Sequence, residues 1–205
     1  MKINVIILSA GYSRRMNEFK PLSLYKEKSF LENIIIKLNK VCDKLIIVTG
    51  YKSAELKNEI IKNLIVNSNT SIIKKIVFAH NKNYDKGMFG SIQTGILECA
   101  NSDWILLHQV DQPGIPKKFY TDFTSQIDSE HNWIQPSFKN KYGHPILINK
   151  LLFSLITDEN IASNLRVISK NKKIIKKIWD CNYKEILQDI DTKEDYWELL
   201  RSEKL

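Results

Sequence analysis

The sequence predicts an α/β fold in which a mainly parallel sheet lies between helices on both faces, a three-layer α/β/α arrangement. Three observations support this prediction. Short runs of β-branched and other apolar residues recur along the first half of the chain, segments with helical spacing separate them, and the runs end near turn-forming residues. Helical crossovers make such strands parallel, and ligands then bind at the carboxyl ends of the strands.

The predicted elements alternate from the N-terminus. Strands are predicted at 3–8, 44–49, 72–79 and 104–108, and helices at 30–41, about 53–64 and 91–100. Ser29 is placed to cap the first helix. In the second half, 133–136 and 145–148 are short strand-like pieces, the chain is predicted helical from Asn149 onward, and Thr192 begins the last helix.

Composition limits the class of protein. A chain of 205 residues can form one domain with its own core, and a second independent domain is not expected. The 31 basic and 23 acidic side chains give a net charge of +8, which favours anionic ligands. The lysines are scattered and do not form a stripe interleaved with aromatic residues, so no nucleic-acid surface is predicted.

The cysteines and the apolar segments indicate the compartment. Cys42, Cys99 and Cys181 lie far apart and form no C-x-x-C pair, so neither a zinc site nor a disulfide framework is predicted. We expect buried, reduced thiols in a cytoplasmic protein. The N-terminal apolar run is too short for a signal peptide, and no segment reaches the length that a membrane span needs.

The segment LSAGYSRRMNEFKPL, residues 8–22, follows the first predicted strand. Its small residues would let backbone N–H groups approach a phosphate closely, and two arginines and a lysine would supply positive charge. A solvated connecting loop explains the same pattern equally well. The segment contains neither G-x-x-x-x-G-K-[ST] nor G-x-G-x-x-G, so a kinase-type P-loop and a dinucleotide fold are disfavoured.

Two later segments also follow predicted strands. In HNKNYDKGMFGSIQTGI, residues 80–96, Gly87 and Gly90 precede Ser91, which is suited to begin a helix facing a base or a phosphate. Pattern alone favours a plain connection there. In HQVDQPGIP, residues 108–116, Asp111 stands at a strand end before a proline, a place suited to Mg²⁺ or to an ordinary turn.

These segments and two later ones resemble, in order, five motifs of the MobA-like NTP transferase family. The motifs are L-x-A-G-x-S-x-R-M-x-x-x-K-x-L from Leu8, G-M-x-x-S-l-x-x-G-l from Gly87, D-x-P from Asp111, G-H-P from Gly143 and D-I-D-T-x-E-D from Asp189. The ordered set covers most of the chain and is more specific than any member. D-Q-P and G-H-P are most similar to the molybdenum cofactor cytidylyltransferases of that family.

The resemblance implies a Rossmann-like nucleotidyltransferase fold in a single domain, with a nucleotide-binding half at 1–115 and an acceptor-binding half at 116–205. It implies a reaction in which an acceptor phosphate attacks the α-phosphorus of an NTP and releases pyrophosphate. CTP is the favoured donor, and molybdopterin or its molybdenum-loaded form is the favoured acceptor. A molybdoenzyme or a maturation protein would be a possible partner.

The resemblance also assigns residues to roles. Nucleotide binding falls to Leu8, Ser9, Ala10, Gly11, Arg14, Asn81, Gly87 and Ser91, catalysis to Arg15, Lys20 and Asp111, the Mg²⁺ ion to Asp111 and Asp191 with Asp189 as fallback, and acceptor binding to Gly143, His144 and Pro145. Lys20 would stabilise charge on the α-phosphoryl oxygens, and Arg15 would hold the pyrophosphate. His144 is expected to bind and not to act as a base, because an acceptor phosphate is already ionised.

The chain departs from the family pattern at four places. Asn17 stands where the family has Gly, Gln109 where it has a small or apolar residue, Tyr142 where it often has Arg, and Ala162, Ser163 and Asn164 interrupt a G-D-x-G-A-R-like segment. These departures leave two alternatives open. The acceptor could be a sugar phosphate or another small phosphorylated alcohol, or the chain could bind a nucleotide or pterin without catalysis.

Overall fold

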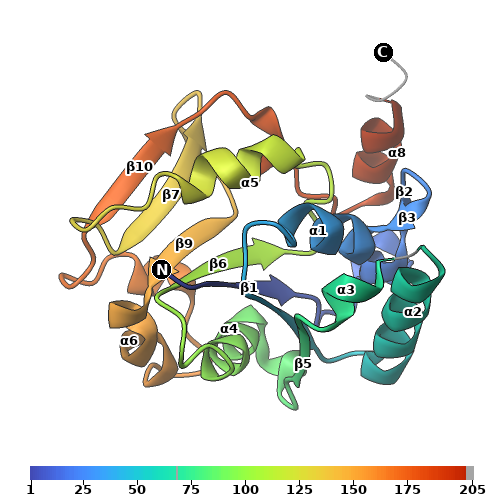
Figure 1. The fold of residues 1–205 in the computed structure, drawn as a ribbon, viewed down its shortest axis with the longest axis horizontal. Helices are drawn as coiled ribbons and strands as arrows, with labels where there is room; N and C mark the ends of the chain where they lie inside the picture. The colour runs from blue at the N-terminus through green and yellow to red at the C-terminus, as the bar shows by residue number, and fades with distance from the viewer. Residues whose placement is uncertain (68, 202–205) are drawn as a thin grey trace.

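A mixed sheet of eight strands forms the middle layer of the computed structural model, which describes residues 1–67 and 69–201 (Figure 1). The strands of this sheet are β1 (Ile3–Leu8), β4 (Lys44–Thr49), β5 (Ile76–His80), β6 (Trp104–Gln109), β7 (Trp133–Phe138), β8 (Lys141–Tyr142), β9 (Ile146–Asn149) and β10 (Lys176–Asp180). Their order is β10-β7-β9-β6-β1-β4-β5, with β8 paired to β7. A separate hairpin joins β2 (Leu24–Tyr25) to β3 (Lys28–Ser29).

Strand directions confirm the predicted mainly parallel, mixed sheet. β1 pairs in parallel with β4 and β6, and β4 pairs in parallel with β5. β9 runs antiparallel to both β6 and β7, while β10 is parallel to β7. Because β1 lies between two parallel neighbours and is covered on both faces, all six of its residues are buried, which explains its unbroken apolar sequence.

Helices cover both faces of the sheet. They are α1 (Phe30–Leu38), α2 (Ser53–Val66), α3 (Thr70–Ile73), α4 (Met88–Leu97), α5 (Lys117–Thr124), α6 (Phe153–Thr157), α7 (Leu165–Ile168) and α8 (Lys193–Arg201), with short 3-10 helices η1 (Arg14–Met16), η2 (Lys20–Leu22), η3 (Tyr84–Lys86), η4 (Lys150–Leu152) and η5 (Lys184–Leu187). Apolar residues of α1, α2, α5 and α8 join one core cluster, and those of α4, α6 and α7 join a second. Alternate β1 residues contribute to each: Val5 and Ile7 to the first, Ile6 and Leu8 to the second.

Several predicted elements are wrong in extent or type. Residues 72–73, predicted as the start of a strand, end the short helix α3, and β5 begins only at Ile76. α4 begins at Met88 and not at Ser91. The region after Asn149 is not wholly helical, because β10 forms an edge strand there. Its sequence, KKIWD, has three charged residues in five, so it gives little apolar signal.

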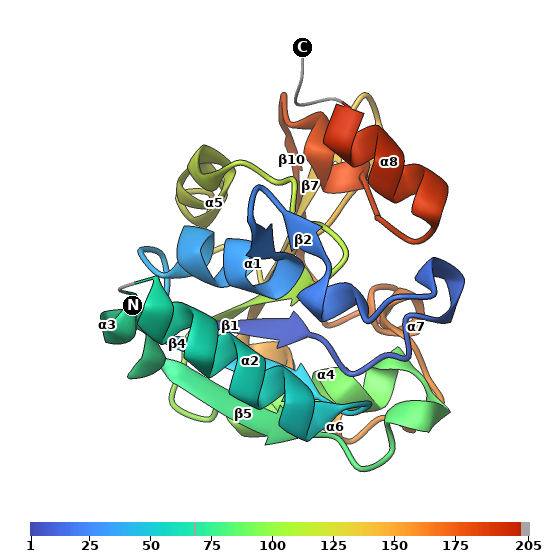
Figure 2. The same ribbon diagram turned by 90° about the vertical axis from the view of Figure 1, so that its right-hand side faces the viewer.

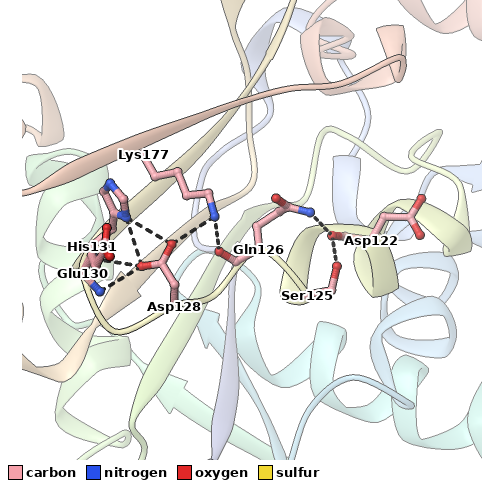
Figure 3. Close-up of polar contacts among 7 residues, drawn as sticks. All are labelled: Asp122, Ser125, Gln126, Asp128, Glu130, His131 and Lys177. Carbon is pink, nitrogen blue, oxygen red and sulfur yellow. Dashed lines mark hydrogen bonds and ion pairs between the residues drawn. The ribbon is translucent and has the colours of Figure 1, made fainter.

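Charged contacts tie β10 to the loop between α5 and β7 (Figure 3). The Lys177 ammonium donates to the Asp128 carboxylate at 3.0 Å and to the Gln126 carbonyl at 2.8 Å. Asp128 also accepts hydrogen bonds from the backbone N–H groups of Glu130 and His131. The Lys177 hydrogen bond and these further contacts hold the pKa of Asp128 well below its usual range. This side of the sheet is therefore fixed by a polar network at its edge.

The cysteines follow the prediction only in part. Cys42 and Cys99 are buried, and burial raises the pKa of each thiol to about 12. Cys181 is half-buried at the end of β10. Within the described residues, none of the helices has the length and apolar character that crossing a membrane requires.

Candidate active site

A cavity of about 360 Å³, the first cavity, lies at the carboxyl ends of β1 and β6, where ligands of parallel sheets bind. Four segments line it: the loop after β1, the η3–α4 region, the end of β6 and the residue Asp191 before α8. It brings together every residue assigned to nucleotide, catalytic or metal roles except Asn81 and the fallback ligand Asp189: Leu8, Ser9, Ala10, Gly11, Arg14, Arg15, Lys20, Gly87, Ser91, Asp111 and Asp191.

The loop after β1 keeps its turn despite the departure at Asn17. Ser13 and Asn17 flank η1 with left-handed backbones at φ 56° and 55°, a conformation that Asn tolerates better than most residues. The Asn17 N–H donates to the Arg14 carbonyl, and the Ser13 hydroxyl accepts from the Lys20 N–H at 3.0 Å. The loop therefore folds back and directs Lys20 toward the cavity.

The small residues of this loop border open space. A Cβ on Gly11 would meet no heavy atom within 4 Å, so a ligand could approach its backbone. The Ser9 N–H, in contrast, already donates to the Val48 carbonyl at 2.9 Å, while the buried Ser9 hydroxyl has no hydrogen-bond partner among the described residues. Ser9 as a nucleotide contact stays a prediction, and its hydroxyl is the polar group that no described residue engages. The Arg14 guanidinium stacks on Tyr12, 4.5 Å from the ring centroid.

Two carboxylates distant in sequence face the same lysine. The Lys20 ammonium lies 2.8 Å from Asp191 Oδ1 and 3.6 Å from Asp111 Oδ2. The Arg15 guanidinium lies 2.9 Å from the other oxygen of Asp191. Figure 2 shows the loop after β1 and α8, which follows Asp191, on the same side of the molecule. The first cavity thus holds two carboxylates and two cations in mutual contact.

Asp111 has the properties of a metal ligand. Burial raises the pKa of its carboxyl to about 6, although the Lys20 ammonium opposes the shift. Its Oδ1 atom is buried and has no hydrogen-bond partner in the part of the chain that the structure describes. Residues 1–67 and 69–201 contain no group of three or more His, Cys, Asp or Glu side chains that could hold a metal. Two carboxylates are nevertheless what Mg²⁺ uses when substrate phosphates and waters complete its coordination, so these residues fit that ion.

Asp195 holds the backbone that carries Asp191. Its Oδ2 atom accepts hydrogen bonds from the N–H groups of Asp191 at 3.0 Å and Thr192 at 2.8 Å. The Asp195 N–H in turn donates to the Thr192 hydroxyl at 3.1 Å. This reciprocal cap at the start of α8 fixes the backbone at Asp191 and therefore the direction of its side chain. We therefore assign Asp195 as a positioning residue.

Replacing Asp195 should separate this role from general stability. We expect Asp195→Ala to lower kcat and to weaken Mn²⁺ binding, each about fivefold, because the loss of one cap costs about 1 kcal/mol and leaves Asp191 mobile. Asp195→Asn keeps an oxygen acceptor and should retain most of both quantities. Electron paramagnetic resonance of Mn²⁺ gives the affinity. Equal losses in the two variants, or a lower melting temperature with unchanged Mn²⁺ affinity, would contradict the assignment.

The residues near the expected base differ in accessibility. Gly87 has φ 114°, which favours glycine, and caps α4, whose first turn carries Ser91 into the first cavity. Asn81 is buried outside that lining. Its amide donates to the Ser91 hydroxyl at 3.0 Å, and its carbonyl accepts from the Asn83 N–H. Asn81 as a direct base contact stays a prediction, and the structure gives it a position behind Ser91.

A second cavity of about 710 Å³ lies beside the first, and Met88 lines both. Of the residues assigned to the acceptor, only His144 lines it. Burial lowers the pKa of His144, which keeps the imidazole neutral at pH 7 and suits a binding role. Gly143 and Pro145 are buried, and a Cβ on Gly143 would lie 2.6 Å from the Ile186 carbonyl. These two residues shape the turn that presents His144.

An aromatic group that the sequence motifs do not include lies at the first cavity. Tyr12 lies 5.1 Å from Tyr51 and 5.3 Å from Tyr84, measured between ring centroids, and Tyr84 lines the cavity. The three tyrosines follow β1, β4 and β5 respectively. An aromatic residue just after each of three parallel strands was the signal available in the sequence. Gln109, the unexplained departure at the end of β6, also lines this cavity.

A parallel sheet whose strand ends carry a small-residue turn, cations and two carboxylates defines a nucleotide-binding α/β protein. The model of the MobA-like NTP transferase domain matches residues 5–176, and the chain belongs to this family. It is a nucleotidyltransferase, as the motifs predicted. The division into a nucleotide half and an acceptor half stays a prediction. Asp191 belongs to the predicted acceptor half but lines the first cavity, and Met88 belongs to the predicted nucleotide half but also lines the second.

Individual relatives agree with this membership. The chain is 28% identical over 197 residues, 95% of its length and 93% of the relative's, to the molybdenum cofactor cytidylyltransferase of Escherichia coli. It is 26% identical to the probable molybdenum cofactor guanylyltransferase of Bacillus cytotoxicus, covering 97% of this chain and 96% of that one. The crystal structure of 4-diphosphocytidyl-2C-methyl-D-erythritol synthase from Anaerococcus prevotii superposes with TM-score 0.76 at 13% identity, covering 100% and 96% of the two chains, which confirms the fold.

Proposed function

We propose that this nucleotidyltransferase transfers CMP from CTP to the phosphate of a molybdopterin-type acceptor, with Mg²⁺ as the metal. The observation that carries the proposal is the contact of Lys20 with both Asp111 and Asp191 in the first cavity. The names of the relatives include a cytidylyltransferase and a guanylyltransferase, both of molybdenum cofactor. These names support the proposed acceptor more strongly than the choice of CTP as the nucleotide. D-Q-P and G-H-P favour CTP.

The residues of the first cavity have roles that the reaction requires. Two phosphate-bearing reactants repel each other, so the site must neutralise charge and align the attacking oxygen with the α-phosphorus. A Mg²⁺ ion held by Asp111 and Asp191 would supply charge neutralisation at the α-phosphate. Lys20 and Arg15, released from their carboxylate partners, would then donate to the α-phosphoryl oxygens and to the pyrophosphate.

The second cavity supplies the place for the acceptor. It adjoins the first at Met88, and His144 faces it as a neutral donor or acceptor. An acceptor seated there would present its phosphate toward Lys20 and Asp111. The attacking phosphate is ionised at neutral pH, so none of the described side chains needs to act as general base. We expect the reaction to take place in the cytoplasm, with a molybdoenzyme or a maturation protein receiving the product.

Pyrophosphate release tests this function directly. The purified protein is assayed with each of the four NTPs against molybdopterin, its molybdenum-loaded form and a panel of sugar phosphates, with Mg²⁺ and with EDTA. We expect release to be fastest with CTP and a molybdopterin acceptor and to stop in EDTA. Release with a sugar phosphate alone would refute the acceptor. No release with any pair, together with nucleotide binding that ignores Mg²⁺, would refute the enzyme.

A further inference from the structure

The second cavity carries positive charge that nothing in it neutralises. Arg166, Lys170 and Lys176 line it, and none of its lining residues is Asp or Glu. No described residue forms an ion pair with these three side chains. The first cavity differs, because Asp111 and Asp191 there offset Lys20 and Arg15. All three side chains are exposed to solvent, and their clustering without a counter-charge around one cavity favours an anionic ligand.

A residue that lines the same cavity carries a buried donor. Trp133 is 2% exposed, lines the second cavity, and its indole N–H has no hydrogen-bond acceptor among the described residues. Leaving a buried N–H unsatisfied is costly, and native structures rarely do so without a ligand or water. The Lys176 ammonium stands 5.7 Å from the centroid of the same ring. An anion at this place would pair with the lysine and accept from the indole.

The fold explains why these side chains meet. Trp133 of β7 pairs directly with Lys176 of β10, so the two lie side by side on the sheet. Arg166 belongs to α7, and Lys170 follows it, on the segment that covers this end of the sheet. The same segment begins at Asn164, where the chain departs from the family's G-D-x-G-A-R-like pattern. The positive charge therefore comes from α7, the residues that follow it and β10.

The reacting phosphate does not account for this charge. That phosphate must reach the α-phosphorus in the first cavity, beside Lys20 and Asp111. The cations of the second cavity belong to a different lining, which shares only Met88 with the first. We propose that the acceptor carries a second anionic group, distinct from the phosphate that attacks, and that Arg166, Lys170, Lys176 and the Trp133 indole bind it. This inference rests on the proposed function and specifies the chemistry of its acceptor.

Nuclear magnetic resonance of the tryptophan indoles tests the site with inorganic phosphate as the probe. The full chain, saturated with CTP and Mg²⁺, is titrated with phosphate at constant ionic strength, and the Trp133 signal is identified by its loss in Trp133→Phe. We expect a saturable shift of that signal, with the exposed Trp197 indole unchanged. Each lysine would donate a charge-assisted hydrogen bond to the anion, so Lys170→Gln/Lys176→Gln should weaken the phosphate affinity at least about tenfold.

A matched variant controls for the loss of charge alone. Lys172→Gln/Lys173→Gln removes the same charge from exposed lysines that do not line the cavity, and its phosphate affinity should stay unchanged. No saturable shift, or equal weakening in both double variants, would overturn the proposal. If CTP still raises the melting temperature of every variant in that case, the second anionic site fails while nucleotide binding stands.

Kinetics distinguish an acceptor group from a free anion that binds independently. With molybdopterin as acceptor, Lys170→Gln/Lys176→Gln should raise the acceptor KM about tenfold or more and leave the KM for CTP within twofold. Inorganic phosphate should inhibit competitively against the acceptor. An unchanged acceptor KM, or inhibition by phosphate that is not competitive with the acceptor, would show that the acceptor does not use this site.

Discussion

Lys20→Ala is expected to lower kcat about 10²–10³-fold, the loss typical of removing one donor that stabilises charge in the transition state. Lys20 is buried, and its ammonium contacts both carboxylates of the first cavity. Without it, Asp111 and Asp191 would repel each other, and the pKa of Asp111 would rise further because Lys20 now lowers it. Steady-state pyrophosphate release measures the effect.

Two variants separate the role of Lys20 from its packing. Lys20→Met keeps the length and apolar stem of the side chain and should lose as much turnover as Lys20→Ala. Lys82→Ala, at an exposed lysine outside the first cavity, should be indistinguishable from the wild type. A circular dichroism melt shows whether each variant folds. Near-normal turnover in a folded Lys20→Met protein would refute the assigned role.

Asp111→Asn should lower turnover by orders of magnitude. In the absence of metal, the same substitution should stabilise the folded protein. Burial raises the pKa of Asp111 from 3.8 to about 6, so its ionised form disfavours folding at pH 8. Removing that charge should raise the free energy of unfolding at pH 8 by about 1–3 kcal/mol. The gain should shrink as the pH falls through 6 toward 4, since the folded wild type then becomes protonated as well.

This change in stability is measured as the melting temperatures of Asp111→Asn and the wild type at pH 8 and pH 4, with EDTA or with Mg²⁺ and CTP. The ligands should stabilise the wild type by mass action and have less effect on Asp111→Asn. The kcat/KM of the wild type should also fall below about pH 6, because a protonated Asp111 binds metal poorly. If Asp111→Asn melts below the wild type in EDTA at pH 8, the ionised Asp111 carboxylate does not destabilise the folded protein.

Strong local signals in the sequence were sufficient to predict the centre of the sheet. β1, β4 and β6 are apolar runs buried between neighbours, and nothing in their sequences competes with a strand. α3 was misread because Ile72 and Ile73 are apolar and β-branched, and a short apolar run does not distinguish a strand from a helix. β10 was missed because it forms at an edge whose pairing with β7 a single sequence does not reveal.

The site was predictable where a motif specifies the side chain. It was not predictable where the packing of the fold determines whether a side chain lines a cavity. The motifs anticipated that Asp111 and Asp191 would converge, and Lys20 joins them. They could not show that the Asn81 amide donates a hydrogen bond to the Ser91 hydroxyl, because that bond depends on how β5 packs against α4. The unpaired cations of the second cavity, likewise, come together only through the pairing of β7 with β10 and the position of α7.

Asp191 lies near the C-terminus, whereas Arg15 and Lys20, the cations that it pairs with in the first cavity, lie near the N-terminus. During synthesis on the ribosome, β1, β4, β5 and β6 and the loop after β1 therefore leave the exit tunnel well before the second carboxylate does. A nascent chain, or one shortened ahead of Asp191 by a premature stop codon, would present Arg15 and Lys20 without that partner. Such a fragment would keep the positive charge that attracts polyphosphates but lack one of the two proposed metal ligands, so we expect it to bind nucleotide without turning it over.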